Sequence, residues 1–183
     1  MPAERALAVW DALTIAGQAF ELKPAGMLAL DVARTEAGLL LLDVDYVGSR
    51  KALIPSQRYS PYELGLSRLV SLDKAPFVGR AALAEERRIG ARRQIVGLEI
   101  EWSEVERLYE KRGLAPVAPA ATSRVAVPVV RGSRQIGRAT TTAWSPTLKR
   151  LIALATIDRP YYEEGAHVAF EITVEGARHF VGA

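Results

Sequence analysis

Alternation of apolar and polar residues is clearest near the C-terminal end of the chain. From His167 to Val174 every second residue is apolar, which is the period of a half-buried strand. Three shorter β-prone runs lie before it, at residues 125–130, 138–144 and 151–157. A Ser-Pro-Thr turn separates the last two, and Glu175-Gly176 has the composition of a two-residue hairpin turn. Short strands separated by turns predict a small antiparallel barrel or sandwich.

The first part of the chain shows a helical period instead. Apolar residues recur at helical spacing over residues 4–16, and Gly17 is expected to end this helix in a left-handed conformation. A second helix is predicted over residues 25–37, with Gly38 as its stop.

Two shorter helices are predicted further along the chain. One covers residues 80–86, with Ala81, Ala82 and Leu83 packed inward. The other has Ser103 and Glu106 in the spacing of a capping box at its start. Between them Gly90 marks a boundary, because an alternating stretch that begins at Arg93 predicts another half-buried strand.

Arg34 occupies an unusual place in the second helix. It lies on the same helical stripe as Met27 and Leu30, where an apolar residue is expected. A buried guanidinium needs an anion, since an uncompensated buried charge costs about 3–5 kcal/mol. Asp31, three residues earlier, is one candidate, and a carboxylate or carbonyl of a ligand is the other. Spacing alone favours the pairing with Asp31.

Composition limits the classes of function. Apolar residues make up 49% of the chain and charged residues 25%, as in ordinary globular proteins. The 24 Lys and Arg exceed the 21 Asp and Glu only slightly, so net charge does not indicate nucleic acid. There is no Cys and there are two His, which makes a metal site unexpected. No signal peptide or membrane-length apolar run is present, so we expect a cytoplasmic protein.

Four arginines lie close together at residues 87, 88, 92 and 93. They could contact nucleic acid, but no aromatic residue is interleaved among them to stack on bases. A solvated helix end, whose partial negative charge favours cations, is the preferred interpretation.

Several segments resemble one known family. Residues 136–155, I-G-x-A-T-T-T-x-x-S-P-T-L-x-x-x-I-A-L-A, resemble the C-terminal barrel of the glycine cleavage T-protein (aminomethyltransferase) family. Residues 34–38, R-x-E-A-G, are similar to a segment of the family's folate-binding domain. Two further motifs of that domain are similar to residues 61–66, P-Y-E-x-G-L, and 71–80, S-L-D-K-x-x-F-x-G-R. Residues 47–59 look like an insertion, which could be a lid over a site or, as we expect, a surface loop.

The resemblance implies an α+β fold, in which a C-terminal antiparallel β-barrel follows the helical tail part of an α+β folate-binding domain. We expect the folate-binding part at residues 1–90 and the barrel at residues 91–183. The resemblance also implies tetrahydrofolate as the cofactor and an aminomethyl or methyl group as the unit that is transferred to it.

The resemblance further implies four residues that bind folate or substrate: Arg34, Glu63, Arg68 and Arg93. Arg34 matches the arginine that lines the folate pocket in the family. Arg68 stands where glycine-cleavage enzymes commonly have a tryptophan beside the pterin, and losing an aromatic platform indicates a divergent member. The family also places basic residues near Arg93, where they meet the glutamate tail of the folate. Asp45 fits an acidic residue of a short D-x-D run.

Only the second half of a T-protein is matched, without the aspartate assigned to catalysis in the family. We therefore expect a fragment of a transferase that is inactive alone, and we predict no catalytic and no metal-binding residue in it. The expected partners are folate and either a lipoyl carrier protein or the N-terminal half, with neither nucleic acid nor membrane. An incomplete barrel edge favours a homodimer. The alternative is a non-catalytic barrel module that binds folate or a protein.

Overall fold

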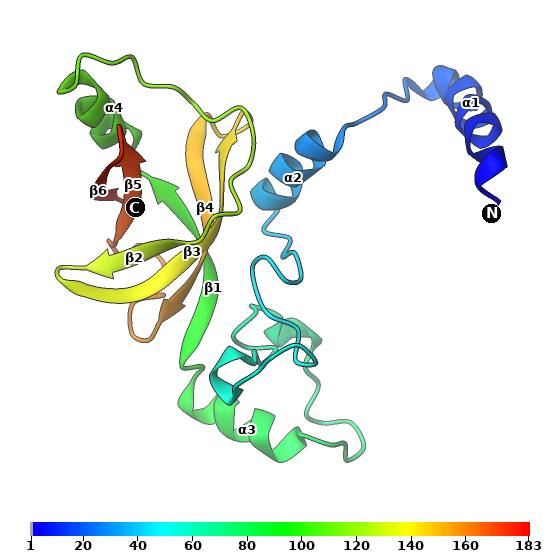
Figure 1. The fold of residues 1–183 in the computed structure, drawn as a ribbon. Helices are drawn as coiled ribbons and strands as arrows, with labels where there is room; N and C mark the ends of the chain where they lie inside the picture. Colours follow the sequence, from blue (N-terminus) through cyan, green and yellow to red (C-terminus); the bar gives the residue numbers. More distant parts are fainter. Residues whose placement is uncertain (1) are drawn as a thin grey trace.

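The computed structural model describes residues 2–183, and its centre is one six-stranded sheet (Figure 1). All neighbouring strands are antiparallel, in the order β1-β4-β3-β2-β5-β6. The strands are β1 (Arg93–Ile100), β2 (Val127–Arg131), β3 (Arg134–Ser145), β4 (Arg150–Asp158), β5 (Ala169–Val174) and β6 (Ala177–Gly182). Every strand predicted from the β-prone runs and the alternation is present, and the predicted α+β fold class is confirmed.

The turns between the strands follow from local sequence. The hairpin between β5 and β6 has Glu175 at φ 50° and Gly176 at φ 74°, the left-handed pair that a two-residue turn requires. The strand predicted to begin at Val125 begins at Val127 instead. Arg124 just before it turns toward the second helix, where its Nη2 lies 2.8 Å from Asp31 Oδ2. A tertiary contact therefore delays the strand.

The two edges of the sheet approach each other at one end. The Glu101 N–H donates to the Gly182 carbonyl at 2.8 Å, and the Gly182 N–H donates to Glu104 Oε2 at 2.7 Å. Helix α4 (Trp102–Glu110) begins next to these two contacts, one residue ahead of the predicted start at Ser103. The capping box predicted for Ser103 is wrong, because Glu101 occupies the N-cap position and makes no side-chain cap.

The core lies inside the curled sheet. Its largest buried side chains come from facing strands and from α4, and they are Ile100, Val105, Val129, Ile136, Ile157 and Val181. Gly137 on β3 allows the closest approach of two strands, since a Cβ there would lie 2.2 Å from the Thr156 carbonyl oxygen. Trp102 of α4 packs edge-on against Trp144 of β3 with ring centroids 4.9 Å apart.

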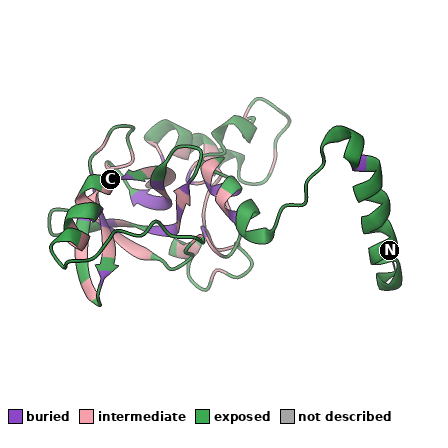
Figure 2. Ribbon diagram, turned by 90° about the horizontal axis from the view of Figure 1, so that it is seen from above, coloured by how far each residue is buried: buried purple, intermediate pink, exposed green. Residues whose placement is uncertain are grey.

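The two N-terminal helices differ in their surroundings. Helix α2 (Met27–Glu36) lies against β3 and β4, whereas α1 (Ala6–Gly17) stands apart at the end of an extended segment (Figure 1). Figure 2 shows α1 exposed along almost its whole length. Gly38 ends α2 with φ 67°, as predicted. The prediction for Gly17 is wrong, because its φ is −77°.

A short 3-10 helix, η2 (Gln18–Phe20), extends α1 beyond Gly17. The left-handed residue is Glu21 at φ 55°, and the Leu22 N–H donates to the Gly17 carbonyl at 3.0 Å. A Cβ on Gly17 would lie 2.4 Å from Leu22 Cδ2. The glycine is therefore needed for the close approach of Leu22, and not for a left-handed backbone conformation at the end of the helix.

Residues 39–79 connect α2 to helix α3 (Arg80–Ile89) through loops and short 3-10 turns. The expected insertion at residues 47–59 is a loop, with one 3-10 turn at Pro55–Gln57. The alanines of α3 are exposed, so their predicted inward packing is wrong; only Leu83 and Glu86 are partly covered. No described helix is long and apolar enough to span a membrane. The division of the chain at residues 90 and 91 stays a prediction.

Candidate functional site

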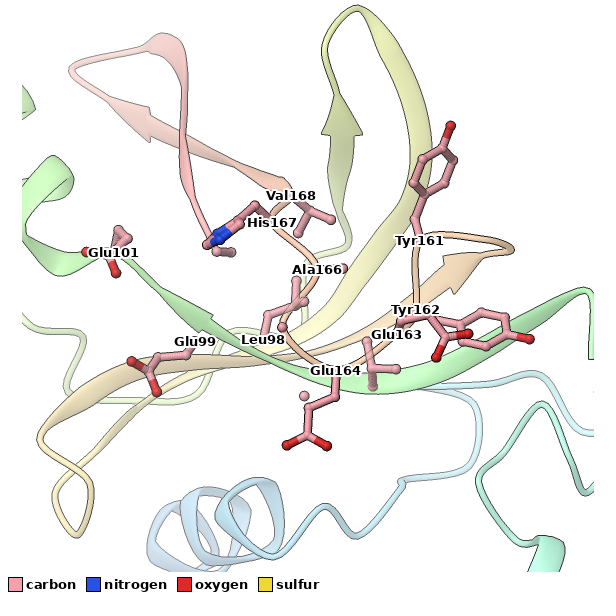
Figure 3. Close-up of a pocket in the computed structure, with 14 residues that line it drawn as sticks. Leu98, Glu99, Glu101, Tyr161, Tyr162, Glu163, Glu164, Ala166, His167 and Val168 are labelled. Atoms are coloured by element: carbon pink, nitrogen blue, oxygen red, sulfur yellow. The ribbon is translucent and has the colours of Figure 1, made fainter.

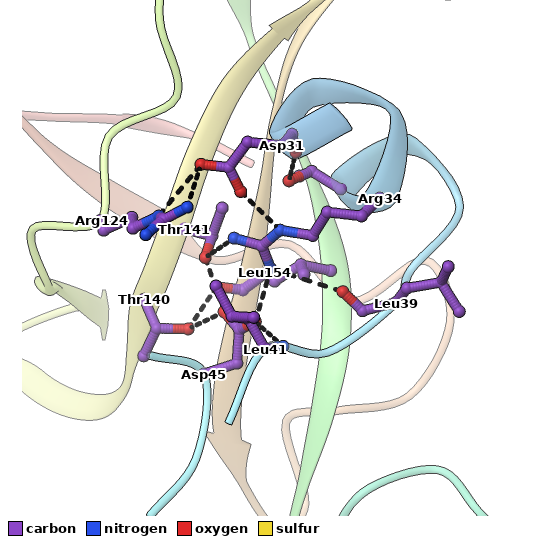
Figure 4. Close-up of polar contacts among 10 residues, drawn as sticks. Asp31, Arg34, Leu39, Leu41, Asp45, Arg124, Thr140, Thr141 and Leu154 are labelled. Atoms are coloured by element: carbon purple, nitrogen blue, oxygen red, sulfur yellow. Dashed lines mark hydrogen bonds and ion pairs between the residues drawn. The ribbon is translucent and has the colours of Figure 1, made fainter. Parts of the chain in front are cut away.

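A buried cluster of charged side chains joins α2 to the sheet, with Arg34 at its centre (Figure 4). Its Nε donates to Asp31 Oδ1 at 2.7 Å, and its Nη1 donates to Asp45 Oδ2 at 2.6 Å. Its Nη2 donates to the hydroxyl of Thr141 on β3 at 3.1 Å. The same guanidinium therefore holds its own helix, the following loop and a strand together.

The acidic partners in this cluster are also satisfied. Both hydroxyls at Thr140 and Thr141 donate to Asp45 Oδ1, at 2.9 and 2.6 Å, and the Leu41 N–H donates to Asp45 Oδ2 at 2.7 Å. Asp31 accepts from Arg34 and from Arg124 Nε at 3.0 Å. Two cations thus balance two carboxylates, which is the condition under which buried charge is tolerated.

The environment of Asp31 shifts its acidity. Burial acts to raise the pKa of Asp31, but the hydrogen bonds and charges of Arg34 and Arg124 outweigh it and hold the pKa below its ordinary value. Asp31 is therefore a carboxylate at neutral pH and is unsuited to donate a proton there. Its contribution is to anchor the two guanidiniums.

Glu63 is the centre of a second buried cluster, at the start of β1. Its Oε1 accepts from Arg92 Nε at 2.8 Å and lies 3.3 Å from Arg93 Nε. Its Oε2 accepts from the Ser60 N–H at 3.1 Å. The Ile95 N–H donates to the Glu63 carbonyl at 2.8 Å, so the residue ties this loop to the strand with side chain and backbone.

Aromatic residues connect the two clusters. The guanidinium of Arg93 lies over the ring of Tyr59, with Cζ 3.8 Å from the centroid, a cation–π arrangement. The Tyr59 hydroxyl is 3.0 Å from Thr156 Oγ1 on β4, and its ring meets Tyr46 edge-on at 6.0 Å. Tyr46 directly follows Asp45. A continuous polar and aromatic seam therefore runs along this side of β3 and β4.

Arg68 lies in a different setting. It is exposed on the 3-10 turn η4 (Ser67–Leu69) and lines a hollow of about 540 Å³ together with Tyr62, Gln94 and Tyr162. A neighbouring hollow of about 460 Å³ is lined by Glu63 and Arg92, and both hollows share Glu86 and Gly90. The hollow at Arg68 offers a cation that can meet an anionic group from solvent, and the neighbouring hollow offers the exposed Arg58 in the same way.

The structure thus brings together two of the four predicted site residues. Glu63 and Arg93 are in contact, and Arg68 lines the hollow next to the one at Glu63. Arg34 is in the separate cluster with Asp45. The predicted pairing of Arg34 with Asp31 is present, while the roles of all four residues toward folate stay predictions.

Sequence reasoning missed several members of these clusters: Arg124, Thr140, Thr141 and Tyr59. The Thr-Thr-Thr run on β3 carried a usable signal, because a buried hydroxyl needs an acceptor and only a residue distant in sequence could supply it. Arg124 lies 93 residues from Asp31, and nothing in local spacing connects them.

Glu36, at the end of α2, has structural partners on the sheet and the turn after it. Glu36 accepts hydrogen bonds from the Ser145 hydroxyl and from Thr147, and the bond from Ser145 does most to lower the pKa of Glu36. Among the described residues Glu36 forms no ion pair. Within residues 2–183 no group of three or more His, Asp and Glu could hold a metal ion.

Comparison with known proteins agrees with this geometry. The family model described as "GCVT N-terminal domain" matches residues 1–74. The family model described as "Glycine cleavage T-protein C-terminal barrel domain" matches residues 93–180. The two matches cover the seam and the sheet it lies on. The chain belongs to the glycine cleavage T-protein family.

Relatives named aminomethyltransferase support the same assignment. The protein from Caldanaerobacter subterraneus is 33% identical over 92% of this chain and 38% of its own length. The protein from Thermosynechococcus vestitus is 32% identical over 100% of this chain and 41% of its own length. The structure of the aminomethyltransferase T of Bartonella henselae has a TM-score of 0.68 at 21% identity, covering 43% of that chain, and so shows the fold. The chain spans about 40% of the length of these relatives.

Proposed function

We propose that the chain supplies part of a tetrahydrofolate-dependent one-carbon transferase, and that these 183 residues alone do not catalyse the transfer. The observation that carries the proposal is that this chain is 32–33% identical to proteins named aminomethyltransferase over nearly all of its own length. The match covers only about 40% of the length of those relatives. A lipoyl carrier protein that presents the aminomethyl group is the proposed donor.

The residues of this chain would act by binding and positioning. The exposed cation of Arg68, with Arg87 beside it in the same hollow, is suited to the carboxylates of a folate glutamate tail. Arg34 has five N–H donors, and its bonds to Asp31, Asp45, Thr141 and Leu39 leave one hydrogen on Nη2 for a ligand. Holding the folate in place is a substantial part of such catalysis, because little covalent chemistry is asked of the protein.

Two measurements test the proposal. Titration calorimetry should detect binding of tetrahydrofolate to the chain, and Arg68→Ala should weaken it about tenfold, the value of one charge-assisted hydrogen bond. Arg88→Ala is the matched control, because Arg88 is also exposed, on α3, but pairs with Glu85. Equal effects of the two substitutions, or no binding at all, would contradict the folate site.

The second measurement is an activity assay with tetrahydrofolate and aminomethyl-lipoyl carrier protein. We expect no methylene-tetrahydrofolate from this chain under conditions in which a relative named aminomethyltransferase produces it. Product that rises in proportion to the amount of this chain would overturn the statement that it is inactive alone.

A further inference from the structure

A hollow of about 370 Å³ lies on the outer face of the sheet, over strands β1, β3 and β4. Among the residues that line it, Arg93 of β1 lies opposite Asp158 of β4. Arg138 of β3 lies opposite Thr156 of β4. Thr156 and Asp158 are two residues apart on one strand, so all four side chains share a face. Ile157 between them belongs to the core, so that face is the outer one.

Arg93 is held in a fixed orientation at this outer-face hollow. Its side chain is 15% exposed, and its guanidinium rests on the ring of Tyr59 with Cζ 3.8 Å from the centroid. Nη2 donates to the Arg58 carbonyl at 2.8 Å, and Nε is fully covered 3.3 Å from Glu63 Oε1. Within residues 2–183 Nη1 has no acceptor, and unlike Nε it is not fully covered. A preorganised guanidinium therefore has one nitrogen left for an anionic group from solvent.

The other two charged groups of the outer-face hollow are unpaired. Arg138 and Asp158 are exposed, and neither forms an ion pair within the described chain. Arg93 is the direct cross-strand neighbour of Asp158, but Glu63 and Tyr59 hold its guanidinium. Arg138 is diagonal to Asp158, at a spacing of about 7–8 Å between such positions. The hollow thus presents donors from two guanidiniums beside one free carboxylate.

This arrangement of charges selects a class of ligand. A simple anion would be attracted by the guanidiniums but repelled by Asp158, and a simple cation would meet the reverse. A molecule with a carboxylate and an ammonium group close together satisfies all three side chains. Free α-amino acids have these two groups on one carbon atom, and the volume of the hollow has room for a small one.

A larger cavity beside β1, of about 690 Å³, has a different composition (Figure 3). It is lined by four glutamates, Glu99, Glu101, Glu163 and Glu164, and none of the described residues that line it is Lys or Arg. A carboxylate of a ligand would meet no guanidinium or ammonium group there. Of these two sites, the outer-face hollow is the one with the charges that a zwitterion requires.

We propose that the outer-face hollow binds a free α-amino acid in its zwitterionic form. The carboxylate of the amino acid accepts hydrogen bonds from Arg93 Nη1 and from Arg138, and its ammonium group donates to Asp158. The proposal is independent of one-carbon transfer. It also involves a different surface from the hollow at Arg68, which is proposed for the glutamate tail of folate.

The probe is L-alanine, because its side chain is small and binding then depends on its two charged groups. Nuclear magnetic resonance of the isotope-labelled chain should show saturable shifts of the Arg93 and Asp158 amide signals, with a Kd of about 1 mM. N-acetyl-L-alanine lacks the ammonium group and L-alaninamide lacks the carboxylate. Each analogue should therefore bind at least about tenfold more weakly than L-alanine.

Substitutions with matched controls assign the charged groups. Arg138→Ala should weaken binding of L-alanine at least about tenfold. Arg134→Ala should not, because Arg134 is an exposed cation on the same strand but outside the hollow. Asp158→Asn should weaken binding to a similar extent. Glu163→Gln should not, because Glu163 is an exposed carboxylate in the loop after β4 and does not line this hollow.

Three results would overturn the proposal. The first is the absence of saturable shifts at about 10 mM L-alanine. The second is equal binding of N-acetyl-L-alanine, which would mean that the hollow accepts anions in general. The third is saturable binding that leaves the signals of Arg93 and Asp158 unchanged. Because all three measurements use the unaltered chain, a folding defect in a variant would not affect the outcome.

Discussion

Helices α1 and α2 adjoin in sequence but differ in what they contact. Helix α1 is rich in apolar residues, yet none of its side chains is buried, and Ile15 is 68% exposed. Helix α2 is more polar, and it buries Asp31, Arg34 and Thr35 against the sheet. The apolar residues of α2, such as Met27 and Leu30, face solvent. In this segment a polar cluster, and not apolar content, determines which helix is attached.

Burial of a helix requires a partner surface of matching chemistry. The hydroxyls of Thr140 and Thr141 give β3 a polar patch, and a guanidinium with its carboxylates complements it. Strand β4 shows the opposite case, since apolar residues such as Leu151 and Ile157 are covered by other strands. Among the described residues, the main contacts of helix α1 are with the short turns η1 (Ala3–Arg5) and η2 on either side of it and with Leu22 just beyond.

The first prediction removes the polar cluster that attaches α2. Asp45→Ala leaves Arg34 with one carboxylate fewer in a buried site, so the free energy of unfolding should fall by about 3–5 kcal/mol. Urea denaturation measures the loss. Hydrogen exchange of the α2 amides should accelerate in the same variant, since the loop that fastens the helix is released.

Asp43→Ala is the control for that substitution. Asp43 is two residues away in the same loop, and it pairs with Lys51 in an exposed position. Its removal should lower the free energy of unfolding by no more than about 1–2 kcal/mol, because exposed ion pairs contribute little and the remaining cost is that of Ala at the left-handed φ of 63°. If Asp43→Ala and Asp45→Ala behave alike, the buried cluster does not hold α2.

The second prediction compares the same substitution in α1 and in the sheet. Ile157 is 1% exposed and belongs to the core, so Ile157→Ala should cost about 2–5 kcal/mol through lost burial and a cavity. Ile15→Ala on α1 should change stability by no more than about 0.5 kcal/mol. A loss of several kcal/mol from Ile15→Ala in urea denaturation would show that α1 packs on the rest of the molecule in solution.

Sequence reasoning succeeded where one local pattern decides the structure. The hairpin at Glu175-Gly176 and the stop of α2 at Gly38 follow from residues that accept a positive φ. The strands at residues 138–144 and 151–157 were predicted from two runs of β-prone residues with a Ser-Pro-Thr turn between them. The resemblance of the same stretch to one family gave the fold class.

It failed where contacts between distant residues decide. The cap predicted at Ser103 did not form, because α4 is positioned by Glu101 and by the packing of Trp102 on Trp144. Spacing on one helix revealed Asp31 as a partner of Arg34, but Asp45 and Thr141 lie 11 and 107 residues from it. Such partners depend on the tertiary fold, which local periodicity does not encode.

The third prediction uses acid to weaken the attachment of α2. The pKa of Asp31 in the folded chain lies below its ordinary value of 3.8, because Arg34 and Arg124 together outweigh the effect of burial. A carboxyl with a lowered pKa contributes stability that is complete above the unfolded value and disappears as pH falls through the folded value. This contribution should therefore persist at neutral pH and decline only below pH 3.8.

Asp31→Asn isolates this effect from the titration of other carboxyl groups. The variant lacks the charge at every pH, so it should be less stable than the natural chain at neutral pH. The difference in stability should shrink as acid protonates Asp31 in the natural chain. Arg34 and Arg124 then lack the negative charge of residue 31 in both proteins. Urea denaturation of both proteins between about pH 7 and pH 2 measures the difference. A difference that stays constant over this range would mean that the charge of Asp31 does not hold the cluster, and that its hydrogen-bonding shape alone attaches α2 to the sheet.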